Sequence, residues 1–332
     1  MKPFMKYPGG KAKEAPLVSR YKPQNINNYY EPFVGGGAIF FELDNNMSYI
    51  NDYSKDLIDL YLLLQSGDKK LEDYLTYFNK LWRNIENAII DKNLFLDTVF
   101  NYSTFKKHVE EAMIKKESTI KKFEGNGIKI SKENRSQIKL TARKTAFYMC
   151  IRDIYNDKKI TGPLHVASYF FLREYCYSSM FRFSKNGVFN VPYGGMSYNS
   201  KYLDEKIEYM FSNEMMLKLY KTKICNLDFE LFLEEYDPQN DDFIFLDPPY
   251  DSEFSTYDQN TFDKNEQIRL KNALTKSNAK WMLIIKKTDF IYSLYSDFFI
   301  YEYNKNYKVS FKNRNEKDVK HLLITNYEIE VK

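Results

Sequence analysis

The sequence predicts an α/β protein built around a mostly parallel, doubly wound sheet. Short β-prone runs alternate with helical patterns at both ends of the 332-residue chain, whereas the middle is helical in pattern. The 12 glycines are few and clustered, and each cluster marks a sharp turn or a close approach of the backbone. We therefore expect one domain formed by residues 1–66 and 221–332, interrupted by an insertion at 67–220.

Composition narrows the class of protein. Hydrophobic residues make up 43% of the chain, so it should fold around a sizeable core, and the net charge of +4 is too small to indicate a polyanionic partner by itself. Three scattered cysteines and a start without an apolar leader favour a cytoplasmic protein. No run of 18 apolar residues is present, so no membrane span is expected.

The first part of the chain reads as a βαβα unit that follows a short helix. A helix that begins at Lys11 should end before Pro23, since proline disfavours a helical residue before it. Ser54 is a plausible cap for the last helix of the unit. The expected elements are a helix over 11–21, a strand over 28–33, a helix over 38–43, a strand over 48–50 and a helix over 57–64.

The insertion is expected to be mostly helical, with Leu71, Leu75 and Phe78 at helical spacing and a buried aromatic helix over 169–183.

One stretch of the insertion differs from this helical pattern. Residues 115–144 hold ten Lys or Arg and three Glu, a net charge of +7, around two glycines at 125 and 127. Apolar residues flank that turn, which favours a short β-hairpin. Its charges could be merely solvated, but phosphate contact is the preferred interpretation if the partner is DNA.

The α/β alternation returns at residue 222. The expected strands cover 222–225, 243–246, 281–285, 298–303, 305–311 and 319–325, the last pair hairpin-like, and the expected helices cover 229–235, 264–275 and 289–295.

A glycine-rich turn follows the first strand, in the run from Glu31 to Gly37. Glycines there let a ligand approach the backbone at the carboxyl edge of a sheet, and Asp52 at the end of the next strand suits ribose hydroxyls. The pattern is neither GxGxxG nor a phosphate-binding Walker loop. A tight turn with an aspartate helix cap explains it about equally well.

The sharpest signal is Asp247-Pro248-Pro249-Tyr250 at the end of an apolar strand. The strand holds the carboxylate at the mouth of the sheet, and two prolines remove two N–H donors and leave carbonyls free to accept. A fixed carboxylate, a free carbonyl and an aromatic ring suit a planar base with an exocyclic amino group. The alternative is a strand-ending turn with an incidental aspartate. Asp251 and Glu253 nearby could suggest a metal nuclease, but that reading leaves the prolines and glycines unexplained.

These motifs resemble the Dam-type, alpha-class DNA adenine-N6 methyltransferases. The resemblance covers both ends of the chain and leaves much of 69–160 unmatched. Its motifs are Lys6-Tyr7-Pro8-Gly9-Gly10-Lys11, the Glu31–Gly37 run, Asn51-Asp52, Asp228-Phe229, the Asp247–Tyr250 run, and Gly187–Gly194. The resemblance implies a Rossmann-like methyltransferase sheet that ends in an antiparallel hairpin, S-adenosylmethionine as cofactor, duplex DNA as partner, and a target-recognition domain at 67–220.

The resemblance also implies roles for single residues. Asp247 to Tyr250 would hold the flipped adenine, with Asp247 also near the cofactor. Other cofactor contacts would come from Tyr7, Gly9 and Lys11, which close over it, from Phe33, Gly35 and Gly37 at its methionine part, from Asp52 at the ribose, and from Asp228 and Phe229 at the adenine ring. No metal is expected, because the sulfonium already activates the methyl group. The histidines show no metal-ligand spacing, and the cysteines read as small core residues.

Sequence reading is expected in the loop that starts at Arg182. Phe183 would serve as a wedge, whereas Arg182, Lys185 and Asn186 could reach base edges. The alternative is a core role for Phe183 and a phosphate contact for Lys185. The expected DNA-binding residues are Arg182, Phe183, Ser184, Lys185, Asn186, Asn190 and Pro192. Ser184 stands where many members carry Asn, and Lys286-Lys287 where Ser-Asn is usual. GATC is the working hypothesis for the target sequence.

The function expected is a site-specific transfer of a methyl group from S-adenosylmethionine to N6 of a flipped adenine in duplex DNA. A separate restriction endonuclease is a conceivable companion. One rival is methylation of RNA adenine or of cytosine-N4, which Tyr250 after the prolines and the large insertion disfavour. The other is a DNA-binding protein without catalysis, against which the intact motifs count.

Overall fold

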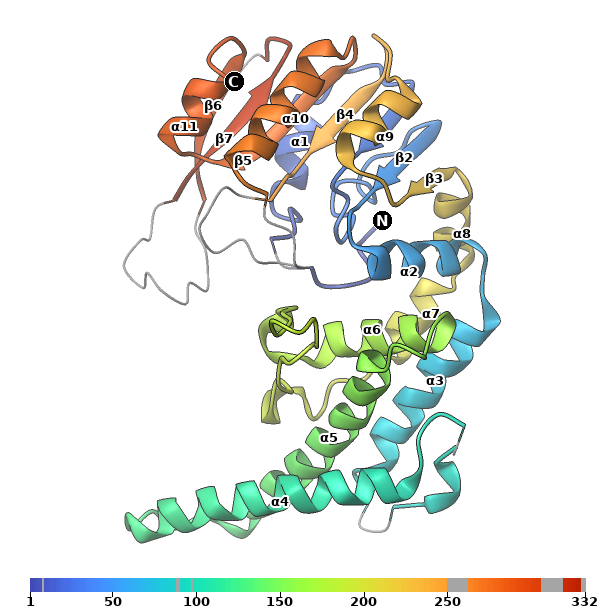
Figure 1. Ribbon diagram of the computed structural model, residues 1–332, viewed down its shortest axis with the longest axis vertical. Helices are drawn as coiled ribbons and strands as arrows, with labels where there is room; N and C mark the ends of the chain where they lie inside the picture. The colour runs from blue at the N-terminus through green and yellow to red at the C-terminus, as the bar shows by residue number, and fades with distance from the viewer. Residues whose placement is uncertain (8, 88–89, 97, 250–261, 306–318, 330–332) are drawn as a thin grey trace. The chain divides into compact units, whose positions relative to one another are not determined.

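The computed structural model describes residues 1–7, 9–87, 90–96, 98–249, 262–305 and 319–329 (Figure 1). The chain divides into two compact units, each made of separate stretches. An α/β unit comprises residues 1–3, 9–61 and 217–332, and a helical unit comprises residues 4–8 and 62–216. The functional roles assigned to these two parts from the sequence stay predictions.

The α/β unit contains a sheet in the order β3-β2-β1-β4-β5-β7-β6 (Figure 1). The first five strands in this order are parallel, and only β7 pairs antiparallel with both of its neighbours. The predicted α/β class and the closing antiparallel hairpin are therefore confirmed. The strands are β1 (Asn28–Glu31), β2 (Met47–Asn51), β3 (Thr222–Cys225), β4 (Phe243–Leu246), β5 (Lys280–Lys286), β6 (Phe299–Lys305) and β7 (Val319–Thr325).

Apolar residues on both faces of the central strands explain why this sheet forms. All four residues of β4 are buried, as are the five central residues of β5, which is the pattern of a parallel strand covered on both sides. On one face, alternate side chains of β4, β5 and β7 pack against three helices in a single core cluster. These helices are α9 (Phe229–Tyr236), α10 (Lys264–Lys276) and α11 (Asp289–Leu294).

Two N-terminal predictions need correction. The helix expected over 11–21 is shorter, since α1 spans Ala15–Tyr21 and residues 12–14 form turns. The helix expected over 38–43 is absent. There, Phe41 N–H bonds to the Gly37 carbonyl four residues back, but Glu42 N–H bonds to the Ile39 carbonyl only three back. Ile39, Phe40, Phe41 and Leu43 are buried in these mixed turns, so apolarity in this run did not signal a regular helix. The second helix, α2 (Lys55–Gln65), forms as expected.

The C-terminal predictions agree closely with the structure. Strands β3 and β4 match the predicted ranges, and α9, α10, α11 and β5 match to within one residue at either end. The expected strand over 305–311 lies outside the described residues from 306 on, and the strand that pairs with β7 is β6 instead.

The helical unit is organised around α3, α5 and α6, whose aromatic rings interlock. Trp82 of α3 packs edge-on against Phe171 of α6, with ring centroids 5.5 Å apart, and Phe147 of α5 packs against the same Phe171 at 5.5 Å. The predicted aromatic helix over 169–183 begins earlier and ends at residue 175. The helices are α3 (Lys69–Asn84), α4 (Tyr102–Gly125), α5 (Lys132–Asn156), α6 (Pro163–Tyr175), α7 (Asp204–Met210) and α8 (Asn213–Tyr220), with single 3₁₀ turns at Lys92–Leu94, Tyr177–Ser179 and Met196–Tyr198.

The basic hairpin predicted near 115–144 is wrong as a β-hairpin, because the stretch forms two packed helices, α4 and α5 (Figure 1). Eight lysines, two arginines and three glutamates make up 13 of its 30 residues, and all three residue types are good helix formers. Ser131 caps α5 by accepting from Asn134 N–H at 3.1 Å. The turn itself was placed correctly, with Gly127 at φ +80°, but it joins helices rather than strands.

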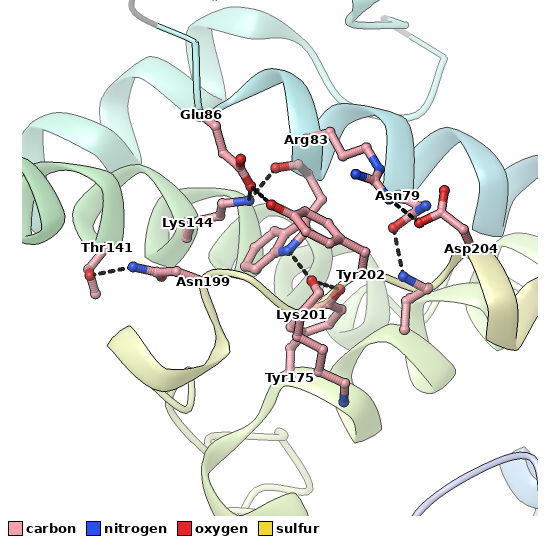
Figure 2. A network of polar contacts seen from close by, with 12 residues as sticks. Asn79, Arg83, Glu86, Thr141, Lys144, Tyr175, Asn199, Lys201, Tyr202 and Asp204 are labelled. Atoms are coloured by element: carbon pink, nitrogen blue, oxygen red, sulfur yellow. Dashed lines mark hydrogen bonds and ion pairs between the residues drawn. The ribbon is translucent and has the colours of Figure 1, made fainter.

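A buried lysine, Lys144 of α5, lies at the centre of a polar network in this unit (Figure 2). Its ammonium pairs with the Glu86 carboxylate at 2.7 Å, donates to the Trp82 carbonyl and lies 4.1 Å from the Trp82 ring centroid. Tyr202 donates to the same Glu86 carboxylate at 2.7 Å, and Trp82 donates to the Lys201 carbonyl at 2.9 Å. The network thereby fastens the segment before α7 to α3 and α5.

Burial lowers the pKa of Lys144 to about 8, although the Glu86 carboxylate opposes this shift. Between pH 8 and 10 the folded chain therefore loses a proton that the unfolded chain keeps, and the unfolding free energy should rise with pH by about 2 kcal/mol from this group. In Lys144→Met this rise should disappear. Denaturant unfolding from pH 7 to pH 10, taken as the difference from wild type, measures it.

The matched control is Lys139→Met, which removes an exposed ammonium from the same helix and should keep the rise. Parallel pH profiles for wild type and Lys144→Met would contradict the assigned titration.

Candidate active site

The parallel strands bring the predicted site residues to one edge of the sheet. Strands β3, β2, β1 and β4 are mutually parallel, so their carboxyl ends share an edge. The loops that leave this edge carry the glycine-rich turn, Asp52, Asp228 and Asp247. All of these residues belong to the α/β unit.

The side chain of Asn51 ties three of these loops together. Its amide nitrogen donates to the Pro32 carbonyl at 3.1 Å and the Leu227 carbonyl at 3.0 Å, and its oxygen accepts from Leu227 N–H at 2.8 Å. Its backbone carbonyl accepts from Val34 N–H at 2.9 Å. Asn51 is 1% exposed. In the sequence analysis, Asn51 appeared only as the neighbour of Asp52 in a motif. An amide that ends a buried strand was the available signal.

Asp52 holds the glycine-rich turn in place. Its carboxylate accepts from Gly35 N–H at 2.9 Å and from Ser54 N–H at 2.9 Å, and it stays half-buried. Gly37 adopts φ +71°, and a Cβ there would lie 2.7 Å from the Tyr61 hydroxyl. The backbone of this turn therefore fits closely against α2, and Gly37 is needed for packing inside the protein as well as for its conformation.

Asp228 and Phe229 lie beside an arginine that was not predicted as a site residue from the sequence. Asp228 caps α9 by accepting from Glu230 N–H at 3.0 Å, and it forms an ion pair with Arg269 of α10. The Arg269 guanidinium also lies 4.4 Å from the Phe229 ring centroid. The ring centroids of Phe33 and Phe229 lie 5.5 Å apart, so the loop after β1 and the loop after β3 share an aromatic contact.

Asp247 forms an ion pair with the ammonium of Lys11, which is only 3% exposed. Residues 236 positions apart in sequence, both predicted from motifs, are thus in direct contact. Glu31 lies buried nearby and accepts from the Tyr29 hydroxyl at 2.7 Å. Burial raises the pKa of Glu31, and the Asp247 charge raises it further. Of the two carboxylates, Asp247 is the one with solvent access, at 21% exposure.

The proline turn after Asp247 is held from α10. Gln267, fully buried, donates from its amide nitrogen to the Pro249 carbonyl at 3.0 Å. Pro248 and Pro249 offer no N–H, so this side-chain bond replaces a backbone restraint that other residues would provide. The predicted Tyr250 lies outside the described residues. Gln267 was not foreseen, because nothing in its local sequence marks a contact 18 residues away.

The remaining predicted cofactor residues divide between the units. Gly9 and Lys11 belong to the α/β unit, with Gly9 at φ +77° and open space where a Cβ would be. Tyr7 belongs to the helical unit, where its ring lies 4.5 Å from the guanidinium of buried Arg173. Arg173 also lies 4.2 Å from the Phe181 ring centroid, just before the predicted reading loop.

The predicted reading loop is a tight turn in the helical unit. Ser184 N–H bonds to the Val188 carbonyl at 2.8 Å, and Phe183 pairs with Phe189 across the turn. Lys185 and Asn186 are exposed at its tip. Phe183 is half-buried, with its ring edge-on to Phe181 and Phe189, so packing competes with its expected wedge role. The other predicted residues form local contacts: Arg182 donates to the Asn190 side chain at 3.4 Å, and the Pro192 carbonyl accepts from Tyr177 N–H at 2.9 Å.

Residues 7–309 match the family described as D12 class N6 adenine-specific DNA methyltransferase. The chain belongs to this family. It is therefore an adenine-specific DNA methyltransferase that uses S-adenosylmethionine as methyl donor, and the predicted family, reaction and cofactor are confirmed at this level.

Similar proteins are spread over viruses, archaea and bacteria. The chain is 28% identical to the type II methyltransferase M.CviBI of Paramecium bursaria Chlorella virus NC1A, with 98% of this chain and 100% of that protein covered. It is 30% identical to the type II methyltransferase M.MjaIII of Methanocaldococcus jannaschii, with 98% and 99% covered. It is 23% identical to the DNA adenine methylase of Vibrio cholerae, with 82% and 76% covered.

The residues at this sheet edge fit S-adenosylmethionine, which supplies an activated methyl group on a positively charged sulfur. Partly exposed carboxylates at Asp52, Asp228 and Asp247 suit hydroxyl, amino and cationic groups, and the rings of Phe33 and Phe229 offer an apolar wall. Within the described ranges, no group of three or more His, Cys, Asp or Glu side chains is placed to hold a metal ion. None of the helices in the same ranges has both the length and the apolar character that crossing a bilayer demands.

Replacing Gln267 should slow the reaction without weakening cofactor binding. In Gln267→Leu the Pro249 carbonyl loses its donor, which costs about 0.5–1.5 kcal/mol and corresponds to a roughly two- to tenfold lower kcat if the turn shifts. Single-turnover methylation and cofactor titration measure the two effects separately. Asn272→Leu, an exposed amide on the same helix, is the control and should behave as wild type. Unchanged kcat in Gln267→Leu would show that the prolines alone hold the turn.

Proposed function

We propose that the enzyme methylates N6 of an adenine flipped out of duplex DNA, with Asp247 as the group that orients the amino nitrogen. The observation that carries this is the ion pair between Asp247 and buried Lys11 at the start of the proline turn. The ammonium favours the charged carboxylate, which only accepts hydrogen bonds. It also fixes the carboxylate at the end of β4.

In this proposal the Asp247 carboxylate and the Pro248 carbonyl accept the two amino protons of the adenine. The nitrogen lone pair is thereby turned toward the methyl carbon. S-adenosylmethionine would supply the methyl group to this nitrogen, with its C–S bond breaking as the N–C bond forms, and the methylated nitrogen would release its surplus proton to water. Removing the base from the helix costs a few kcal/mol, which stacking on Tyr250 and hydrogen bonds in the pocket would offset.

The cofactor roles follow the loops that the structure brings together. Phe33, Gly35 and Gly37 would contact the methionine part, Asp52 the ribose, and Asp228 with Phe229 the adenine ring. Tyr7, Gly9 and Lys11 would close over the cofactor. The support is the shared edge, the Asn51 ties between the loops, and the contact between Phe33 and Phe229.

Asp247→Asn should lower the methylation rate by about 10²–10³, because one oriented charged partner of the reacting group is lost. Asparagine keeps the shape of the side chain, so cofactor affinity should change little. Incorporation of labelled methyl groups into DNA and calorimetric cofactor titration are the two readouts.

Asp241→Asn, at the other end of β4 and exposed, is the control and should retain full activity. A rate for Asp247→Asn above about a tenth of wild type, a barrier change near 1.4 kcal/mol, would remove Asp247 from this role. If wild type binds cofactor and DNA without transferring a methyl group, the chain is a binding protein instead.

We further propose that the helical unit reads the target sequence through the turn at 182–190. The support is its geometry: side chains suited to base edges lie exposed at the tip, and paired backbone bonds hold the turn rigid. A lysine suits guanine and an asparagine suits adenine. We also propose a separate restriction endonuclease as a companion, in keeping with relatives that are named type II methyltransferases.

Lys185→Ala and Asn186→Ala should each relax the choice of base at one position of the target. The loss is about 1–3 kcal/mol of discrimination for each bidentate contact. Sequencing of methylated adenines in a methylase-free host would show the target of wild type and of each variant. Lys159→Ala, an exposed turn lysine of the same unit, should leave the target unchanged. Unaltered targets in both variants would move sequence reading elsewhere in the insertion.

A further inference from the structure

One helix of the helical unit, α5, connects the proposed reading turn with a basic surface far from it. At the carboxyl end of α5, the Asn156 side chain bonds to both polar groups of Phe189, donating to its carbonyl at 3.1 Å and accepting from its N–H at 2.9 Å. The Tyr148 hydroxyl donates to the Val191 carbonyl at 2.8 Å. This end of α5 is therefore fastened to the segment 189–191 that leaves the turn.

The other end of α5 carries an exposed basic surface, which we call the arm tip and define as Lys121, Lys122, Lys129 and Lys132. These four exposed lysines flank the loop between α4 and α5. Residues 121–135 hold five Lys or Arg and two Glu, a net charge of +3. Arg135 is engaged by Glu124 in an ion pair. Once this ion pair is set aside, the four arm-tip lysines carry the remaining positive charge, and Glu133 offsets one of them.

The length of α5 sets the reach of the arm tip. Its 25 residues span roughly 36 Å at about 1.5 Å per residue. One helical turn of B-DNA is about 34–36 Å, or about 10–10.5 base pairs. A rigid helix that holds the reading turn at one end and a lysine cluster at the other thus matches the spacing between successive exposures of the same face of the duplex.

We propose that the arm tip contacts phosphates of duplex DNA about one helical turn away from the bases that the turn at 182–190 contacts. This proposal rests on the proposed function, since it takes the turn as the part that meets the target. Lysine ammonium groups bind phosphate as point charges without regard to sequence. The arm tip therefore adds affinity and register but no base discrimination. Phe123 and Ile128 are also exposed among these lysines, so a protein surface is the alternative partner.

The test compares two duplexes with the same mapped target, one with about 5 and one with about 16 flanking base pairs on each side. Two full-length variants are compared with wild type. One changes all four arm-tip lysines to Gln. The control changes Lys221, Lys223, Lys276 and Lys280 to Gln, which removes the same charge from exposed positions of the α/β unit.

We expect wild type and the control to bind the long duplex with a steeper salt dependence than the short one. The slope of log K against log salt should differ by about 0.9 per phosphate contact, or roughly 3–4 in all. The arm-tip variant should bind both duplexes with the shallower slope. Ethylation of phosphates one turn from the target should interfere with binding of wild type and not of the variant.

Equal slopes for wild type on both duplexes, or an arm-tip variant that matches wild type on the long duplex, would overturn the proposal. Those results would leave the exposed lysines and apolar residues to another partner, such as a protein. Methylation of the short duplex distinguishes this failure from failure of the proposed function, because every one of these proteins should methylate it if the function holds.

Discussion

The parallel pairing of β3, β2, β1 and β4 is the constraint on which the active site depends. Parallel neighbours must end at the same edge, and so four loops from distant parts of the sequence leave the sheet side by side. The Asn51 side chain then reduces the freedom of these loops, because it bonds to the backbone on either side of it. Asp52, Asp228 and Asp247 thus acquire fixed positions from the sheet and not from one another.

Charge is used differently in the two units. In the α/β unit the buried Lys11 ammonium serves a carboxylate that keeps access to solvent, which is an arrangement suited to a reacting group. In the helical unit the buried Lys144 serves structure alone, joining Glu86 and the Trp82 carbonyl across α3 and α5. Removing one partner from such a buried pair leaves an uncompensated charge and costs several kcal/mol, which explains why both lysines come with dedicated acceptors.

How much the sequence revealed differed along the chain. In the α/β unit, alternating patterns and buried apolar runs located the strands closely, because strand burial on two faces leaves a dense apolar signature. The prediction of a helix over 38–43 was wrong, because turns with buried apolar side chains have the same apolar sequence as a short buried helix. The stretch 115–144 misled for a related reason. Apolar residues beside a glycine turn do not say whether strands or helices flank it, and the lysine-rich composition was the better guide.

Residues of the candidate site could be predicted from the sequence where they belong to a motif. They could not be predicted where their role depends on a tertiary contact. Lys11 and Asp247 were named from separate motifs, and their contact followed from the fold. Gln267 and Arg269 lie on a helix whose sequence is unremarkable, and their importance comes from the Pro249 carbonyl and the Asp228 carboxylate that they meet in space. Such residues become visible only when the sheet edge and α10 are placed together.

The interleaving of the two units along the chain has a consequence for synthesis on the ribosome. The helical unit ends at residue 216, whereas the sheet also needs β3, β4, β5, β6 and β7, which are made later. The helical unit can therefore close while only β1 and β2 of the sheet exist. During that interval the backbone N–H and C=O groups on one edge of β1 lack their partner strand β4, which lies about 200 residues downstream. The pairing of β1 with β4 is therefore a late step in the formation of the sheet during synthesis.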